Sequence, residues 1–337
     1  MRLMKFNKWF LIFSWLLLSF ILKGQDPVFS QFYLAPTQLN PAFVGNNIGP
    51  NFYLNYRNQW PSINQAYVTY AASYDQFFEN ANSGIGLVLV ADDAGNGLLQ
   101  NNKAMLQYSY RLRVNSKLFV KAGLEVGALQ TRLAWDQLVF FDQLDPQFGA
   151  NTPGGVFIPT SETPPDQTSL YNFDLGFGVA VYSKEFYGGI SLKHLNTPQL
   201  TFFQDADNLS GGLPIRMVLH AGWQISPAGD QYRPGDSMLS PNIIFVNQGS
   251  FRQINIGLHG GLGPVFGGIA YRHAWTNPDA IILSMGFRSG LVRFGYSYDI
   301  TVSSLSVNSG GAHELGLNFI LNYDKPVNYD DCFGLFR

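Results

Sequence analysis

Apolar and polar residues alternate strictly in two adjacent runs of the chain. Apolar positions recur at every second residue from Ala104 to Val114 and again from Leu118 to Ala128. Because successive side chains on a strand point to opposite faces, each run has one apolar and one mostly polar face. The intervening Asn115–Ser116 suits a tight antiparallel turn. Alternation over ten or more residues is the length with which a tilted strand crosses a bilayer.

The same alternation recurs along the chain and predicts further strands. The predicted strands begin at or near Phe52, Val68, Ile85, Ala104, Leu118, Tyr171, Phe186, Ile215, Asn242, Ile254, Val265, Ile281, Val292 and His313. An even number of this size is typical of outer-membrane barrels. The sequence therefore predicts an all-β fold, a transmembrane antiparallel β-barrel of about 14 strands over residues 51–323, with a short N-terminal plug-like segment.

The connections between the predicted strands differ in length in a regular way. With both termini in the periplasm, tight turns such as Gly263–Pro264 fall on the periplasmic side. Long connections such as Asp93–Asn102 and Arg132–Ser169 fall outside. This asymmetry is expected of such barrels. The segment Pro227–Ser240 departs from it, which leaves open a miscounted strand pair.

Composition favours the barrel over a soluble alternative. Charged residues make up 13% of the chain, about half the share of an ordinary soluble domain. A soluble β-sandwich would show the same alternation with its apolar face inward, but so many strands with glycine-rich polar faces fit a barrel better. The net charge of −2 gives no reason to expect a nucleic-acid partner. The single cysteine, Cys332, excludes an intramolecular disulfide and a cysteine-based zinc site.

The N-terminus has the pattern of an export signal. Arg2, Lys5 and Lys8 precede the apolar run Trp9–Leu22, which is too short to span a bilayer easily. We expect a signal peptide over residues 1–24, with an uncleaved membrane anchor as the alternative. No later apolar run approaches 18 residues, so a helical membrane protein is excluded.

Residues 25–50 precede the first strand and contain several prolines, which cannot donate to a sheet ladder. We predict that this segment is a plug or gate in the lumen, because its aromatic residues would form an exposed apolar patch on a free leader. A passive periplasmic leader is the alternative. The plug candidates are Phe29, Ser30, Gln31, Phe32, Tyr33, Asn40 and Pro41, with Phe43 as a further packing anchor.

Charged residues on the polar strand faces are candidates for a network inside the lumen. Lipid would not accept them, because an Arg or Lys at the bilayer midplane costs about 2–4 kcal/mol. The candidates are Arg111, Arg113, Glu125, Arg293, Asp299 and Glu314. Alternation turns Glu314 toward the lumen and His313 toward lipid. A structural role for the network is favoured over a catalytic one.

No pattern indicates catalysis, a metal or a cofactor. The five histidines lack metal-binding spacing. Gly260–Gly268 lacks the Lys-Ser/Thr ending of a phosphate-binding loop, and acidic pairs such as Asp205 and Asp207 supply too few oxygens for a dedicated calcium loop. An outer-membrane hydrolase would need a base beside Ser191 or Ser297, and the sequence assigns none.

The connection Arg132–Ser169 is longer than most structureless loops, and such loops are often functional. Its apolar residues could form a docking surface for cargo, with a solvated surface loop as the alternative. The docking candidates are Leu138, Phe140, Phe141 and Phe157. Residues 324–337 are expected to form a C-terminal periplasmic tail.

Several segments resemble, in order, the motifs of the PorP/SprF family of the type IX secretion system. They are Asp26–Gly45, with its Phe-Ser-Gln-aromatic and Asn-Pro-Ala stretches, Tyr56–Trp60, Leu138–Pro146, His194–Pro198, and Gly295–Asp299 followed by Gly311–Glu314. The similarity covers essentially the whole mature chain. Gly311-Ala312 departs mildly from the more usual Gly-Ser before His-Glu, and the tail beyond Tyr323 matches no motif of the family.

The resemblance implies an outer-membrane barrel of Bacteroidota-type bacteria that serves the secretion of large surface proteins, including gliding adhesins. Such cargo carries a C-terminal sorting domain. The implied partners are outer-membrane lipid, the cargo sorting domain, the type IX translocon and the periplasmic ring and motor components. The rival functions are a plugged outer-membrane transporter for hydrophobic small molecules and, less favoured, an outer-membrane enzyme.

Overall fold

The structure of the chain is a computed structural model. It describes residues 26–47, 49–63, 67–147, 149–152, 155–202, 212–227, 236–275, 277–303, 309–321 and 332–336. The predicted signal peptide, residues 1–24, lies outside the described residues, as do residues 324–331 and 337 of the predicted tail.

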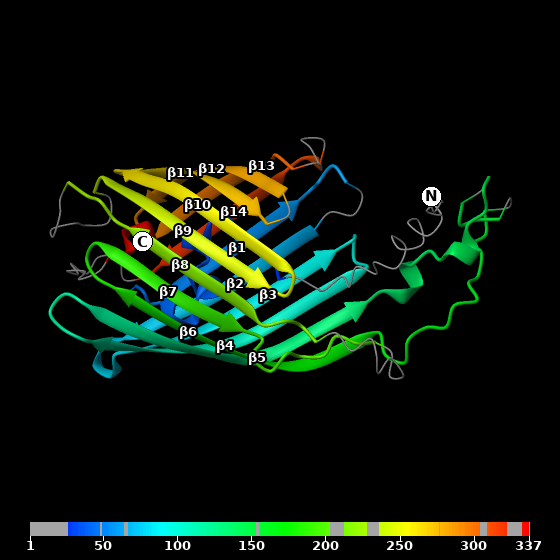
Figure 1. Ribbon diagram of the computed structural model, residues 1–337, viewed down its shortest axis with the longest axis horizontal. Helices are drawn as coiled ribbons and strands as arrows, with labels where there is room; N and C mark the ends of the chain where they lie inside the picture. The colour runs from blue at the N-terminus through cyan, green and yellow to red at the C-terminus, as the bar shows by residue number, and fades with distance from the viewer. Residues whose placement is uncertain are drawn as a thin grey trace, which may run out of the picture.

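Among the described residues, fourteen antiparallel strands form one closed barrel, in which each strand pairs with the next and β1 pairs with β14 (Figure 1). The strands are β1 Asn51–Gln59, β2 Tyr67–Phe78, β3 Ser83–Ala94, β4 Leu99–Arg113, β5 Phe119–Leu133, β6 Ser169–Tyr182, β7 Phe186–Lys193, β8 Arg216–Trp223, β9 Met238–Gln248, β10 Phe251–Leu262, β11 Val265–Ala274, β12 Asn277–Ser289, β13 Val292–Thr301 and β14 Ala312–Ile320. The predicted barrel is confirmed, and each predicted strand corresponds to an observed one. Closure leaves no unpaired sheet edge in hydrocarbon, where an unsatisfied backbone group is costly.

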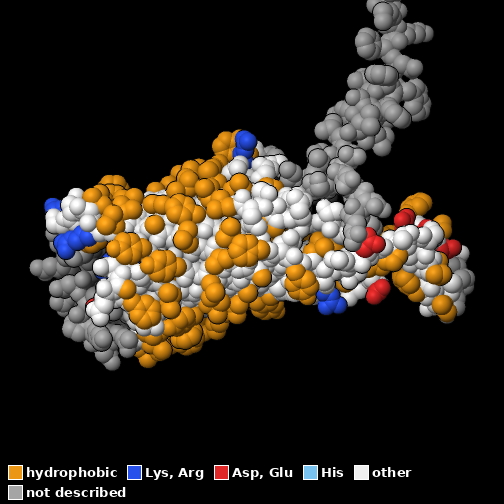
Figure 2. Space-filling view, turned by 90° about the horizontal axis from the view of Figure 1, so that it is seen from below, with side chains coloured by type: hydrophobic (Ala, Val, Ile, Leu, Met, Phe, Trp, Pro, Cys, Tyr) orange, Lys and Arg blue, Asp and Glu red, His pale blue; other side chains and the backbone are white. Residues whose placement is uncertain are grey.

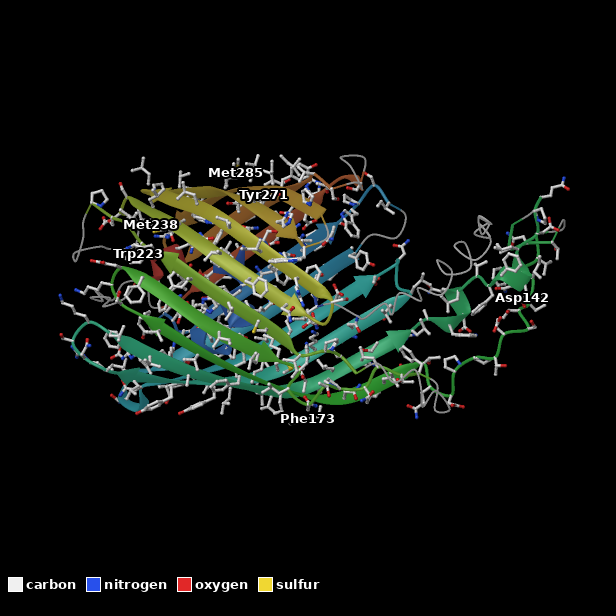
Figure 3. The ribbon with its side chains drawn as sticks, viewed as in Figure 1. Asp142, Phe173, Trp223, Met238, Tyr271 and Met285 are labelled. Carbon is white, nitrogen blue, oxygen red and sulfur yellow. The ribbon has the colours of Figure 1, made fainter. Side chains whose placement is uncertain are left out.

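The strands turn an apolar face outward, as their alternation predicts. Leu106, Leu124 and Met285 are 63%, 57% and 66% exposed, whereas the intervening Ser109 and Glu125 are buried. Hydrophobic side chains cover the flank of the barrel (Figure 2), and the outward positions labelled in Figure 3 include aromatic residues and methionine. Because lipid solvates apolar groups and not polar ones, this surface suits a bilayer.

Helical structure is confined to short pieces. Three of them, η1 Phe32–Leu34, α2 Pro36–Leu39 and η2 Pro41–Phe43, belong to the N-terminal segment. Proline stands at the start of α2 and η2, where its missing N–H is not needed. The remaining pieces are η3 Glu79–Ala81, η4 Trp135–Gln137, η5 Phe141–Gln143 and η8 Phe333–Phe336. No helix in the described ranges is long and apolar enough to cross a membrane.

The two ends of the barrel differ. We call the end with the β4–β5 and β6–β7 turns the short-turn end, and the opposite end the long-loop end. Residues 134–168 connect β5 to β6 and project far beyond the barrel at the right of Figure 1. The expected long connection Asp93–Asn102 is wrong, because β3 and β4 extend until only residues 95–98 remain between them. The strands on either side of the segment Pro227–Ser240, β8 and β9, pair directly with each other.

The interior is a packed core. A cluster of buried apolar residues joins the N-terminal segment, the inner wall and the end of the chain. Cys332–Phe336 was expected in a periplasmic tail, but these residues are buried inside the barrel. Burial removes the apolar surfaces of Phe333, Leu335 and Phe336 from water, which favours their position in the lumen.

Candidate functional site in the barrel lumen

The N-terminal segment, residues 26–50, runs through the lumen. It begins in the half near the long-loop end, where Asp26 contacts Lys103 of β4 and His194 just after β7. It ends at the short-turn end, where the Val44 carbonyl accepts a hydrogen bond from Lys121 near the start of β5 at 2.6 Å. Every predicted plug candidate is buried: Phe29, Ser30, Gln31, Phe32, Tyr33, Asn40 and Pro41.

Glu314 of β14 fixes the segment by its backbone. The Ser30 and Gln31 amides each donate to one carboxylate oxygen of Glu314 at 2.8 Å. The Gln31 side chain also donates to the Glu314 carbonyl at 3.1 Å. A carboxylate that accepts backbone N–H groups in a dry site makes strong, charge-assisted bonds. Glu314 therefore joins the segment to the wall at one fixed register.

Arg57 and Arg272 complete a charged cluster around Ser30. Arg57 of β1 contacts Glu314 at 3.0 Å and Asp299 of β13 at 2.9 Å. Arg272 of β11 contacts Asp299 at 2.8 Å and pairs with Asp279 of β12. The Ser30 hydroxyl donates to Asp299 and accepts from both arginines. The cluster thus links five neighbouring strands, including the β1–β14 seam that closes the barrel.

Sequence reasoning selected Glu314 and Asp299 but missed Arg57. It turned Arg272 toward the lumen without assigning it to their cluster. The alternation within β1 could have placed Arg57 on the inner face, because Phe52, Leu54 and Tyr56 mark the outer face. What the sequence lacked was the register that sets Arg57 directly opposite Glu314.

A second group of charges holds the start of the segment. The Asp26 carboxylate pairs with Lys103, lies 2.6 Å from His194 Nε2 and lies 3.6 Å from Arg216. His194 Nδ1 lies 2.9 Å from Asp174. Burial alone would raise the pKa of Asp26, but Lys103, His194 and Arg216 together hold it well below its usual value. Burial would lower the pKa of His194, yet its two carboxylate neighbours raise it above 6.5.

These two shifts determine how the stability of the contacts around Asp26 depends on pH. The stabilisation from His194 is complete below about pH 6.5 and is lost as the pH rises through the raised pKa of His194. The contribution of Asp26 is complete above about pH 3.8 and is lost as the pH falls through its lowered pKa. The contacts of Asp26 are therefore strongest in mildly acidic solution.

The middle of the segment is held by Asn40 and by close backbone approach. The Asn40 amide contacts the carbonyls of Val179 and Ile190 and the His220 ring. At Gly123 the wall approaches so closely that an added Cβ would lie 2.3 Å from the Ala42 nitrogen. Only glycine fits there, because any side chain would overlap the segment.

The predicted charge network divides into separate groups. Glu125 pairs with Lys193 at 3.2 Å beside a cavity of about 40 Å³ that Asp26 also lines. Arg293 lies over the rings of Phe266 and Tyr33, at 4.1 Å and 5.4 Å from their centroids. The structure does not bring the two remaining candidates to these groups. Arg111 stacks on Phe77 and Arg113 donates to the Asn115 carbonyl at the β4–β5 turn.

The long loop presents apolar side chains to solvent. Phe141 is 91% exposed and Val156 is 66% exposed. Phe157 is 49% exposed, whereas Leu138 and Phe140 are half-buried. Asp142, at the outer tip in Figure 3, accepts hydrogen bonds from the Ser161 amide and hydroxyl and from Thr160, which lower its pKa.

Ser191 and Ser297 are fully buried in strands. Ser297 faces Glu314 across the β13–β14 pair, but that carboxylate is already bonded to Ser30, Gln31 and Arg57. Within the described residues no group of three or more His, Cys, Asp or Glu side chains could hold a metal ion.

A family model described as "Type IX secretion system membrane protein PorP/SprF" matches residues 21–319. The chain belongs to the PorP/SprF family. It is therefore a membrane β-barrel of a type IX secretion family, and this family is a secretion-system family and not an enzyme family. Residues from several of the resembling segments meet at the N-terminal segment of this PorP/SprF protein, namely Ser30, Asn40, Arg57, His194, Asp299 and Glu314.

Solved structures similar to this PorP/SprF barrel are also barrels. A TodX deltaS2S3 mutant monoaromatic hydrocarbon channel is 11% identical with a TM-score of 0.41, over 84% of this chain and 92% of that one. A Pseudomonas aeruginosa FadL homologue is 11% identical with a TM-score of 0.41, over 81% and 89%. A Rh. blastica porin mutant is 7% identical with a TM-score of 0.33, over 81% and 99%. Likeness this low supports no functional argument. A search of curated proteins gave no significant match.

Proposed function

We propose that this protein is an outer-membrane component of the type IX secretion system that binds exported cargo through the cargo's C-terminal sorting domain and supports its secretion and surface attachment. Family membership over residues 21–319 is the observation that carries the proposal. The short-turn end faces the periplasm and the translocon, ring and motor components, and the long-loop end faces outward. The protein performs no bond chemistry.

Residues 25–50 act as a plug in this proposal. Buried charge clusters at Ser30 and Asp26 hold the start of the described segment in the half near the long-loop end, and Lys121 holds its end at the short-turn end. Its aromatic residues are buried in the core, so in this proposal the segment closes the lumen to solutes. Secretion of a folded surface protein through this lumen is therefore not part of the proposal. The barrel binds cargo while another component forms the passage.

The long loop is the proposed docking surface for cargo. Residues 134–168 carry five carboxylates, Asp136, Asp142, Asp145, Glu162 and Asp166, and no Lys or Arg. Exposed apolar side chains lie beside these charges, and the acidic groups are visible on the projecting part in Figure 2. Large exposed apolar residues mark interaction sites, and an acidic rim favours a partner with basic residues.

A pair of substitutions tests the docking surface. Phe141→Ser with Val156→Ser removes exposed apolar area without touching the barrel, so the barrel level in the membrane should stay unchanged. Secretion of a reporter that carries the sorting domain should fall several-fold. Leu262→Ser is the matched control, because Leu262 is 72% exposed at the short-turn end. Normal secretion by the double variant would exclude docking at this loop, and normal adhesin secretion after gene deletion would exclude the proposed function.

The alternative is uptake of hydrophobic small molecules. Such a transporter needs a continuous apolar path, and the described cavity beside Asp26 measures about 40 Å³ and has charged walls. That volume holds only a few water molecules. Permeation of a hydrophobic solute into liposomes that contain the purified protein, with no cargo co-purifying, would favour the alternative.

A further inference from the structure

Residues 332–336 are buried in the lumen at the short-turn end, and we call the surface that they contact the groove. Figure 1 shows the C-terminus inside the barrel at its left end, where the short turns gather. Cys332, Phe333, Leu335 and Phe336 are each 1–2% exposed. The short helix η8, Phe333–Phe336, lies against the N-terminal segment on one side and the barrel wall on the other.

Aromatic rings make most of the described contacts of this end. The Phe333 ring lies 4.7 Å from that of Tyr182 and 5.6 Å from that of Phe43. The Phe336 ring lies 5.1 Å from that of Phe43 and 5.4 Å from that of Tyr187. Ring pairs at such distances attract beyond the area that they bury. The groove thus recognises two aromatic side chains three positions apart.

One described polar contact of the end is of a kind that other peptides can make. The Gly334 amide donates to the Gln224 side chain at 2.8 Å. The bond uses a backbone N–H group, which every residue except proline offers. The groove therefore recognises a peptide by the spacing of its aromatic rings and by its backbone.

The two segments in the lumen are held differently. The N-terminal segment is fixed by buried ion pairs and by three further hydrogen bonds. Asn40 donates to the wall, the Gln31 amide donates to Glu314, and Lys121 donates to the Val44 carbonyl. The described contacts of residues 332–336 are chiefly apolar. Apolar contacts have no fixed partner geometry that a similar peptide could not reproduce.

We propose that this groove is a peptide-binding site whose resting occupant is the chain's own residues 332–336, and that a segment of an exported polypeptide with two aromatic side chains three positions apart displaces it. Displacement uncovers Phe43 and Phe32 of the N-terminal segment at the short-turn end. The identity of the displacing partner rests on the proposed function. The existence of the groove and of its peptide preference does not.

Truncation after Asp331 tests the site in purified protein. The probe is a fluorescent peptide Ser-Phe-Gly-Leu-Phe-Arg, and the control peptide has alanine in place of both phenylalanines. The truncated barrel should bind the aromatic peptide at least tenfold more tightly than the alanine peptide and at least tenfold more tightly than the full-length barrel does. Equal binding by the truncated and full-length barrels, or equal binding of the two peptides, would overturn the proposal.

Cys332, the single cysteine of the chain, gives a second measurement on the intact protein. In the folded barrel its thiol should react with a maleimide at least a hundredfold more slowly than in the denatured chain, because it is buried. Excess aromatic peptide should accelerate the reaction, and the alanine peptide should not. Fast labelling at rest, or no response to the aromatic peptide, argues against a releasable occupant. Secretion assays are independent of both measurements, so the two proposals can fail separately.

Discussion

Glu314→Gln is the sharpest perturbation of the lumen. The carboxylate is fully buried and accepts hydrogen bonds from two backbone amides and from Arg57. Glutamine keeps the shape and one acceptor oxygen, but it removes the negative charge. It also turns an NH₂ group toward a backbone N–H that needs an acceptor. Asp299 then remains as the described carboxylate that faces both Arg57 and Arg272.

The magnitude follows from burial. Removing one partner of a buried ion pair costs about 3–5 kcal/mol, because the other charge stays desolvated without compensation. The lost bonds to the two amides are part of the same event and are not added separately. We expect Glu314→Gln to lower the free energy of unfolding by about 3–5 kcal/mol, which is a change of roughly two to three and a half powers of ten in the equilibrium constant.

Two readouts separate the barrel from the segment inside it. Urea unfolding of the refolded barrel in lipid, followed by tryptophan fluorescence, reports global stability. Protease cleavage within residues 26–50 reports release of the N-terminal segment. Glu79→Gln is the control, because Glu79 is exposed at the short-turn end. It should change the free energy of unfolding by no more than about 0.5 kcal/mol. It should leave the protease cleavage unchanged.

A double-mutant cycle decides the cause. If Glu314 and Arg57 stabilise each other, Arg57→Gln with Glu314→Gln should cost less than the sum of the single variants. An effect of Glu314→Gln below about 1 kcal/mol, in the range of surface pairs, would refute the reasoning. It would mean that water reaches the cluster and that the lumen is open around Ser30.

Two further predictions concern the same segment. Gly123→Ala should expel the N-terminal segment and expose it to protease, because the new methyl group would overlap it. Gly188→Ala should be tolerated, because the atom nearest to the added Cβ would be 3.5 Å away. Protease cleavage of both variants at equal rates would contradict this packing. Release of the segment should increase as the pH rises through the raised pKa of His194, which contacts Asp26. His194→Asn should flatten this rise when cleavage is measured across pH 6 to 9, and an unchanged profile would show that another group titrates.

Some of the site was readable from the chain. The inner position of Glu314 follows from parity within its strand, and the burial of Phe29 and Phe32 agrees with the tendency of aromatic residues to leave water. The same reasoning assigned Arg111 and Arg113 to the network. Alternation does place them on the inner side of β4. They lie at the end of β4 beside the β4–β5 turn, however, far from Asp299. Alternation gives the face of a residue and not its height in the barrel.

The sequence by itself determined the wall. The apolar face of each strand follows from the two-residue period of its side chains, and this period is a local property of the sequence. The order of the strands followed because consecutive antiparallel strands need only short turns. Closure followed because a membrane barrel cannot leave an edge unpaired.

Only the tertiary structure decided what fills the barrel. Ser30 meets Glu314 across 284 positions of sequence, and residues 332–336 meet Phe43 at the other end of the chain. No periodic pattern encodes such contacts, because they depend on the register of the β1–β14 seam and on the space that remains once the wall has closed. The interior is thus set by shape and desolvation, which exist only in the folded molecule.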